Sequence, residues 1–599
     1  MAKELFERID RKIGDILVDI RSGRIGLPDL QRPFVWKDIK VRDLIDSMMK
    51  GFPVGYVMLW SAPEDYQKAG NIGKGTKQYS RPSDLVIDGQ QRLTSLLAAL
   101  MGETVKDKDF KERKIRLAYH PLENRFEVWT PAFENDNNWI NDISRVFAAD
   151  EEHILSKYLR KLFRQINDGR ERKFMPSLSE DEEDAIDENI HNLLSLRDYI
   201  LPTLRIKSYA DEEQVAEIFK RVNSGGQNLN ENNFIETLLA VYDNDVHTKI
   251  VDFCSASRIP ANKTSYNGII HLNTSHIIRM TVGYGFRRAR LTYAYKILRG
   301  KDLESGVVSD EIRETNIRKF KEALAVVTDL NNWHSFFNLF YEAGYLKSSL
   351  ISSNYVPVYS YVLYLIGKYY YRVSSAELRR IMTLWIFMTT VTKYYTSSSA
   401  ETTVERIFAD LRNIKTPNGF VAYLSNEIEN ALNDDFFRVT LVDNLNSSAA
   451  VSPAWYAYIA SLNVLGTQLL FSSTPASKYW LAGTHGTKSS IDKHHIFPKN
   501  YLRKIGIYSD RDRNQIANFT YLDYGTNINI SDNPPAKYVE KYRCLLGEEA
   551  YRRSCQENAL PENWDKLEYF DFLAQRRKLM AQIIKKAYLK LKARTYPFG

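Results

Sequence analysis

The sequence is poor in cysteine and in long apolar runs. Its cysteines are Cys254, Cys544 and Cys555, and their spacing fits neither a disulfide framework nor a zinc site. No stretch reaches the roughly 18 uncharged apolar residues that a membrane span requires. The N-terminal stretch MAKELFERIDRKIGDILVDI is charged throughout and lacks the apolar core of a secretion signal. These absences predict a reduced, cytoplasmic protein with no membrane partner.

The bulk composition is that of a large folded protein. Hydrophobic residues make up 44% and charged residues 26% of the chain, which argues against disordered and membrane classes. A single core stops growing at roughly 250 to 300 residues, so 599 residues predict two or three domains. The net charge of +8 is compatible with a polyanionic partner. Because it is spread over a large surface, it is weak evidence by itself.

The first part of the chain alternates helical and extended patterns. Helical apolar spacing is present over residues 4–21 and 37–50. Strands are expected at 54–60 and 201–209, and residues 114–130 are typical of a hairpin. The alternation predicts an N-terminal α/β domain.

From about residue 245 to 450 the pattern is nearly all helical and rich in aromatic residues, as in YVPVYSYVLYLIGKYYY. We interpret these aromatics as a helical core, the alternative being a base-stacking surface. The chain closes with QRRKLMAQIIKKAYLKLKAR, which predicts a basic amphipathic helix within residues 571–599. Such a helix is either a solvated structural element or a binder of phosphate.

A strand, a glycine turn and a helix are predicted over DLVIDGQQRLTSLLAALM, residues 84–101. Asp88 and Gly89 suffice for the turn itself, so Gln90, Gln91 and Arg92 are surplus to that need. A helix N-terminus offers unpaired N–H groups and the positive end of its dipole, and an arginine adds a forked donor. The turn is therefore a candidate binding site for an anion such as phosphate.

Two adjacent histidines, His494 and His495, lie in IDKHHIFPKNYL. Neighbouring residues of a strand point to opposite faces, so one ring can coordinate a metal while the other reaches a water. Asn518 and Asn527 follow at spacings that suit a hairpin and a short helix.

This order of histidine and two asparagines resembles the HNH (ββα-metal) nuclease finger. The resemblance implies His495 as general base, Asn518 as the residue that orients it, and His494 with Asn527 as metal ligands; Asn529 is a rival to Asn527. Phosphodiester hydrolysis needs such a base and a cation on the phosphate. Many relatives carry an acidic residue where this chain has His494. Mg²⁺ or Mn²⁺ is expected, and Ni²⁺ or Zn²⁺ stays open.

Three polar stretches, LPDLQRPFVWK, DGQQR and FKRVNSGGQNLN, occur in this order. Together they resemble the N-terminal domain of GmrSD-like modification-dependent (type IV) restriction proteins, which has a ParB/sulfiredoxin-like fold. The resemblance implies binding and hydrolysis of a nucleoside triphosphate, GTP or ATP. The residues that carry the pattern are Gln31, Arg32, Asp88, Gly89, Gln90, Gln91, Arg92, Arg221 and Asn223.

Physical roles follow for some of these residues. Arg92 and Arg221 could neutralise phosphate charge, and Gln90 or Gln91 could bind a water or a base. Asp88 could bind a metal or fix the turn itself. The alternative for each residue is a buried polar network that stabilises the domain.

The expected fold class is α+β multidomain: a ParB/sulfiredoxin-like DGQQR domain (1–245), a helical connector (246–450), and an HNH nuclease domain with the basic C-terminal helix (451–599). The expected function is a nucleotide-regulated, divalent-metal-dependent DNA endonuclease of prokaryotic anti-phage defence. Its partners would be double-stranded DNA, modified DNA being one candidate, and a nucleoside triphosphate; a homo-oligomer stays open. The alternatives are a nucleotide-gated DNA-binding regulator with an inactive finger and an RNA-cleaving toxin.

Overall fold

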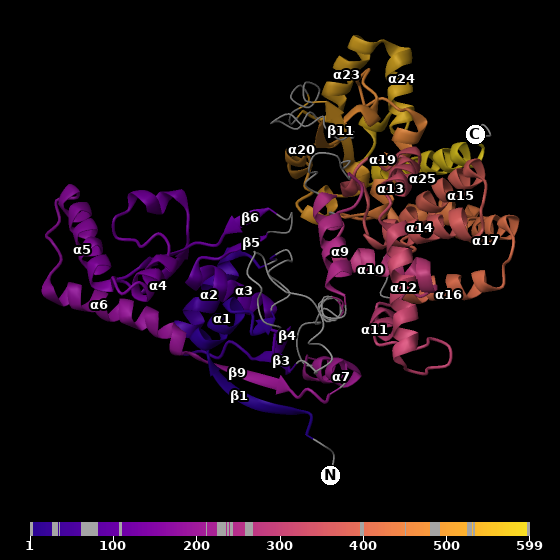
Figure 1. Cartoon of the computed structure of the whole chain (residues 1–599). Coiled ribbons are helices and arrows are strands. Elements are labelled where there is room, and N and C mark those ends of the chain that lie inside the picture. Colours follow the sequence, from indigo (N-terminus) through magenta and orange to yellow (C-terminus); the bar gives the residue numbers. More distant parts are fainter. Residues whose placement is uncertain are drawn as a thin grey trace. The chain divides into compact units, whose positions relative to one another are not determined.

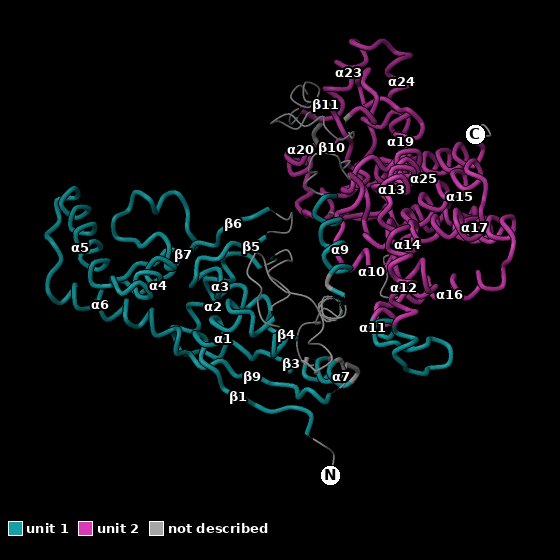
Figure 2. The backbone as a smooth tube through the Cα atoms, in the orientation of Figure 1, with its two compact units in different colours: residues 1–265, 295–313 teal, residues 266–294, 314–599 magenta. Residues whose placement is uncertain are grey.

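The chain divides into two compact units, which Figure 2 distinguishes by colour. Unit 1 comprises residues 1–265 and 295–313, and unit 2 comprises residues 266–294 and 314–599. The structure is a computed structural model. It describes residues 4–26, 34, 36–61, 82–106, 111–210, 212–223, 235, 239, 243–257, 268–395, 400–449, 451–479, 491–523, 530 and 533–595.

Unit 1 is organised around a mixed sheet with the strand order β1-β9-β3-β4-β2. Its strands are β1 (Phe6–Lys12), β2 (Ile25–Gly26), β3 (Val57–Ser61), β4 (Asp84–Asp88) and β9 (Ile200–Ile206). β9 runs parallel to β3, and β2 runs parallel to β4. The β1–β9 and β3–β4 pairs are antiparallel. Strands distant in sequence therefore meet in one sheet.

The predicted helix over residues 4–21 is wrong in its first half. Phe6–Lys12 form β1, and the helix α1 covers Ile13–Arg21. β1 pairs along its whole length with β9, from Phe6 opposite Ile206 to Lys12 opposite Ile200. Its residues alternate between exposed and partly buried, which is the period of a strand. Pairing with a partner almost 200 residues away overrides the local helical spacing.

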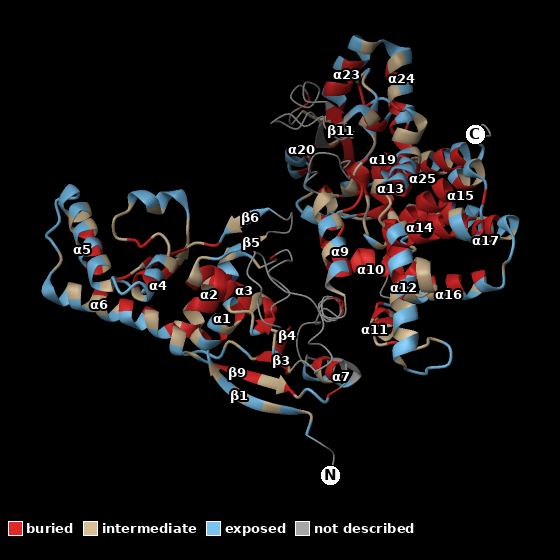
Figure 3. Ribbon diagram, in the orientation of Figure 1, coloured by how far each residue is buried: buried red, intermediate tan, exposed pale blue. Residues whose placement is uncertain are grey.

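Three helices build the core of unit 1 against this sheet: α1, α2 (Asp38–Met49) and α3 (Gln90–Met101). Their apolar faces join the buried residues of β3 and β4 in one hydrophobic cluster, and Figure 3 shows buried residues concentrated on α2 and α3. The predicted helix at 37–50, strand at 54–60 and strand–turn–helix at 84–101 are confirmed.

The rest of unit 1 contains the predicted hairpin and several helices, and β9 confirms the strand predicted at 201–209. The remaining elements are β5 (Thr104–Lys106), β6 (Glu112–Lys114), β7 (Leu117–His120), β8 (Arg125–Val128), α4 (Ser144–Glu151), α5 (Leu155–Arg172), α6 (Glu180–Leu194), α7 (Glu212–Asn223) and α9 (Asn244–Ala256). β7 and β8 form the predicted hairpin.

Helices dominate the middle of the chain. They are α10 (Thr274–Phe286), α11 (Thr292–Leu298), α12 (Asp310–Val327), α13 (Leu330–Glu342), α14 (Tyr355–Leu365), α15 (Ser375–Val391), α16 (Ala400–Arg412), α17 (Pro417–Ala431) and α18 (Leu441–Asn444). Tyr359, Tyr361 and Trp385 are fully buried, and the ring of Trp333 stacks on Tyr361 with centroids 4.0 Å apart. The interpretation of these aromatics as a helical core is confirmed.

The C-terminal part of unit 2 contains a short hairpin among helices: α19 (Pro453–Leu465), β10 (Ile491–His495), α20 (Lys499–Lys504), α21 (Asp510–Arg513), β11 (Phe519–Asp523), α23 (Pro535–Leu546), α24 (Glu548–Glu557) and α25 (Tyr569–Lys592). α25 is the predicted basic helix. One of its faces is buried, from Tyr569 to Leu591, and Lys585 and Lys592 form ion pairs with Asp434 and Glu429. These contacts favour a structural element over a phosphate binder.

The fold is thus mixed α/β, with a small sheet near the N-terminus and a helical remainder, as the sequence indicated at that level. The ParB-like fold, the HNH finger and the three-part domain boundaries stay predictions. In the part of the chain that the structure describes, no helix is both long and apolar enough to cross a membrane.

Candidate functional site

The histidine pair lies on one strand of a two-stranded sheet. β10 pairs antiparallel with β11, which places His494 opposite Thr520 and His495 opposite Phe519. Adjacent residues of a strand project to opposite faces. The predicted hairpin is confirmed, and the two imidazoles are suited to separate tasks.

The ring of His495 is held by contacts on two sides. Its Nε2 lies 3.1 Å from Oδ1 of Asn514, and its ring packs on Phe519 with centroids 4.6 Å apart. With the amide assigned so that its oxygen faces the ring, Nε2 carries the proton and Nδ1 is the nitrogen able to accept one. A histidine fixed in this way is prepared to act as a base.

Asn518 fixes the backbone that follows His495. The amide is fully buried; its Oδ1 accepts from the N–H of Phe497 at 2.8 Å. Its Nδ2 donates to the carbonyls of Phe497 and Arg513 at 3.0 and 3.2 Å. The sequence predicted that Asn518 orients His495. These bonds support an indirect effect, through the chain two residues beyond the histidine, while the amide at the ring belongs to Asn514.

Two further side chains hold the same backbone. The hydroxyl of Tyr538, from α23, donates to the carbonyl of Ile496 at 2.6 Å. Arg576, from the middle of α25, is fully buried and donates from Nη1 to the carbonyls of Ala517 and Phe519, each at 2.7 Å. Its guanidinium thus bridges the residues on either side of Asn518.

Burial lowers the pKa of Arg576, because a low-dielectric site disfavours the charged form. Placing a cation there costs free energy that the carbonyl bonds offset. Sequence analysis missed Asn514, Tyr538 and Arg576. Asn514 lies only four residues before Asn518, whereas nothing local to α23 or α25 indicated a contact with the hairpin.

The predicted metal ligands are only partly described. His494 is partly buried on β10, while Asn527 and its rival Asn529 lie outside the described residues. Among the residues that are described, no group of three or more His, Cys, Asp or Glu side chains is arranged to hold a metal. The imidazole of His494 has the right donor chemistry for one ligand, and the set stays a prediction.

The turn at residues 88–92 is the second candidate site. Asp88 ends β4, and Gly89 has φ 91° before α3 begins. A Cβ at Gly89 would lie 2.9 Å from Val57 Cγ2, so both the positive φ and the close packing require glycine. This conformation places Asp88 at the N-terminus of α3.

Two side chains of this turn bond to the protein backbone. Gln90 is buried and donates from Nε2 to the carbonyl of Val86 at 2.9 Å. Arg92 donates from Nη1 to the carbonyl of Tyr56 at 2.5 Å. These bonds support the structural alternative for part of the motif, because each ties α3 to a strand or to the residue before one.

Asp88 and Arg92 form a desolvated pair of opposite charges. Burial raises the pKa of Asp88, although the N–H of Gly89 and the charge of Arg92 act in the opposite direction. Burial likewise lowers the pKa of Arg92, against the charge of Asp88. Charged groups kept partly out of water at a helix N-terminus are a feature of functional sites.

The other residues of the N-terminal pattern are less fully placed. Gln91 is partly buried, and Arg221 is exposed near the end of α7. Gln31, Arg32 and the side chain of Asn223 lie outside the described residues. The convergence of the three polar stretches on one pocket therefore stays a prediction.

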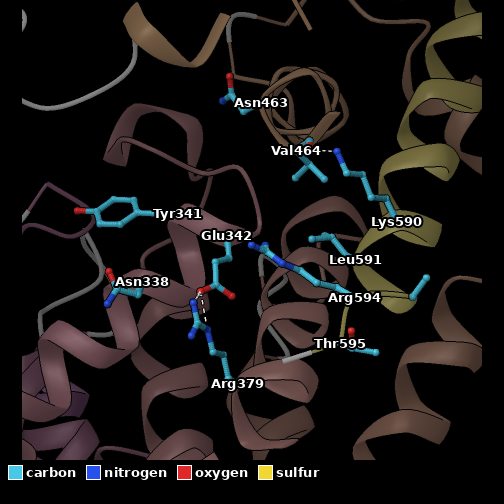
Figure 4. A pocket seen from close by; sticks show the side chains of 11 residues that line it. Asn338, Tyr341, Glu342, Arg379, Asn463, Val464, Lys590, Leu591, Arg594 and Thr595 are labelled. Atoms are coloured by element: carbon cyan, nitrogen blue, oxygen red, sulfur yellow. Dashed lines mark hydrogen bonds and ion pairs between the residues drawn. The ribbon is translucent and has the colours of Figure 1, made fainter. Parts of the chain in front are cut away.

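Unit 2 also contains a pocket of about 980 Å³, lined by residues of α13, α15, α19 and the end of α25 (Figure 4). Its cations have partners on the chain: Arg379 pairs with Glu342, and Lys590 donates to the carbonyl of Val464 at 2.9 Å. Helices α13, α19 and α25 all end at this pocket, and cations are favourable at helix C-termini. The pocket's charges are accounted for by the fold, and we assign it no ligand.

Comparison with known proteins gives two findings. An uncharacterized protein of Methanocaldococcus jannaschii, MJ0686, is 22% identical over 555 residues, which cover 88% of this chain and 86% of that protein. Residues 13–240 match the family described as GmrSD restriction endonuclease, N-terminal domain. The matched range contains the turn at Asp88 and ends before unit 2, and it supports a GmrSD-like family for this chain.

Proposed function

We propose that this protein is a DNA endonuclease of prokaryotic anti-phage defence that depends on a divalent metal and is regulated by a nucleoside triphosphate. The GmrSD match supports a restriction endonuclease and DNA as its partner. The observation that carries the nuclease assignment is His495, held at its ring by Asn514 and at its backbone by Asn518 and Tyr538. A cytoplasmic location, with modified DNA as one candidate substrate, completes the proposal.

His495 acts on the attacking water. Its Nδ1 accepts the proton while the Asn514 amide keeps Nε2 protonated and the ring in place. His494 with Asn527 would hold the metal, which when bound stabilises charge on the phosphate. Because the protein fixes the base before DNA arrives, little reorganisation is needed at the moment of reaction.

A second activity is proposed for unit 1, hydrolysis of GTP or ATP at the turn beside Asp88. The partly desolvated Asp88 and Arg92 at the N-terminus of α3 support it. Differential affinity for two conformations would let the nucleotide regulate cleavage, and the sign of that effect depends on which conformation the nucleotide prefers.

The test is cleavage of plasmid DNA and of RNA by wild type and His495→Ala, with Mg²⁺ or Mn²⁺. DNA nicking by wild type alone supports the proposal. RNA cleavage without DNA cleavage would point to the RNA-cleaving toxin. DNA binding without cleavage under every metal would point to the DNA-binding regulator with an inactive finger.

A further inference from the structure

Helices α5 and α6 form an arm of unit 1 beyond the central sheet (Figure 1). The inner face of α5 is apolar, with Leu159, Leu162 and Ile166 buried. Its outer face carries Lys157, Arg160, Lys161 and Arg164, all exposed. We call these four residues the basic arm face.

The spacing places the four cations on one side of the helix. Residues separated by three, four and seven positions share a face, and Lys157 to Arg164 spans about 10 Å at the usual rise per residue. Lys157 lies in the first turn of α5, where the helix dipole adds positive potential. Asp168 and Glu171, the acidic residues of α5, come only in its second half.

In the part of the chain that the structure describes, the basic arm face has no paired counter-charge. Within the described residues, no carboxylate forms an ion pair with any of the four cations. Some other cations of unit 1 are paired: Arg170 bonds Glu182 through two contacts of 2.7 and 2.6 Å. Arg197 similarly lies 2.6 Å from Asp150.

The neighbouring helix makes this absence informative. The first turn of α6 contains four acidic residues, Glu180, Asp181, Glu182 and Glu183. They follow α5 closely in sequence, and yet none of them forms an ion pair with a cation of the basic arm face. Four exposed cations in one row create a local positive electrostatic potential. Such a potential attracts an anionic partner.

We propose that the basic arm face binds the phosphate backbone of double-stranded DNA. One strand of duplex presents a charge about every 3.4 Å along the axis, so a row of about 10 Å covers roughly three phosphates. Lysine and arginine contacts to phosphate position a protein without reading sequence. The arm thus supplies substrate affinity, and this inference rests on DNA being the substrate in the proposed function.

The test measures DNA affinity of the full-length protein against salt concentration. The arm variant carries Lys157→Gln, Arg160→Gln, Lys161→Gln and Arg164→Gln. A control variant removes the same charge from cations of unit 1 that already have carboxylate partners: Arg8→Gln, Lys12→Gln, Lys50→Gln and Arg125→Gln. The probe is a short unmodified duplex, with binding followed by fluorescence anisotropy.

We expect the slope of log affinity against log salt to become shallower in the arm variant by about 0.9 for each lost phosphate contact, and by about 2.7 if the row neutralises three phosphates. The control should keep the wild-type slope. Equal slopes in all three proteins, or a wild type that does not bind duplex DNA, would overturn the inference. So would a change of oligomeric state at unchanged DNA affinity, which would assign the face to the acidic α6 of a second copy.

His495→Ala separates this inference from the proposed function. That variant should bind duplex DNA with the wild-type salt slope and fail to cleave it. If wild type binds DNA through the arm without cleaving it, the nuclease proposal fails and the arm inference stands. If wild type cleaves DNA and the arm variant binds with unchanged slope, the nuclease proposal stands and the arm inference fails.

Discussion

Replacing Arg576 with methionine tests whether the hairpin positions its base through α25. The variant keeps an unbranched apolar stem and removes the donors to the carbonyls of Ala517 and Phe519, each 2.7 Å away. Phe519 pairs with His495 across the sheet. Loss of the bridge should let this part of β11 shift, and His495 with it.

The expected size follows from the two lost bonds. Bonds to a charged group contribute roughly 1.5 kcal/mol each at the low end, or about 3 kcal/mol together. Methionine offsets part of this loss because it needs no desolvation of a buried charge. We expect the free energy of unfolding of unit 2 to fall by about 1 to 3 kcal/mol. A displacement of the base on the order of 1 Å costs roughly 100-fold in rate.

The assay is plasmid nicking at saturating DNA, with kcat corrected for the folded fraction from denaturant unfolding. Arg279→Met is the matched control, because Arg279 is a buried arginine of unit 2 that pairs with Glu401 in α16. That control should lose stability and keep kcat per folded molecule. Arg576→Lys should recover part of kcat, since its ammonium can still donate to one carbonyl. A folded Arg576→Met with wild-type kcat and KM would refute the positioning role.

The remaining predictions concern the base and the turn. His495→Ala should lower DNA cleavage about 10²- to 10⁴-fold and leave nucleotide hydrolysis, measured as phosphate release, intact. Arg92→Ala should lower nucleotide hydrolysis and abolish any nucleotide response of plasmid cleavage; an equal response would exclude this turn as the sensor. Burial raises the pKa of Asp88, so the folded chain binds that proton more tightly and stability falls as pH rises through the raised pKa. Asp88→Asn should therefore stabilise unit 1 at neutral pH while nucleotide hydrolysis is lost, and unchanged or lower stability in thermal unfolding would contradict this.

Local patterns predicted the elements whose cause is local. The turn at Gly89 needs a residue that adopts positive φ, and the motif DGQQR displays it directly. The histidine pair on β10 could be singled out because two of the ten histidines of the chain are adjacent there. The aromatic helices were readable as core because their apolar residues surround the whole helix, as in α14.

Contacts between distant segments could not be predicted in this way. β1 is a strand because β9 pairs with it, and the sequence of residues 6–12 does not indicate this partner. In the sequence, Arg576 cannot be distinguished from the other cations of the basic helix. Only the fold brings its guanidinium to the carbonyls of Ala517 and Phe519. The resemblance to the HNH finger pointed to Asn518, whereas the ring contact comes from Asn514, the residue directly after α21.

The proposed DNA binding and the proposed DNA cleavage depend on different side chains, so kinetic measurements can separate the two. The basic arm face acts before the chemical step and should change affinity and KM. The groups around His495, including Arg576, act on the position of the base and should change kcat. The arm belongs to unit 1 and the hairpin to unit 2, so the two sets of substitutions lie in different compact units of the chain. A loss of kcat in the hairpin variants at unchanged DNA affinity is thus evidence about the placement of the base, and not about a general loss of substrate binding.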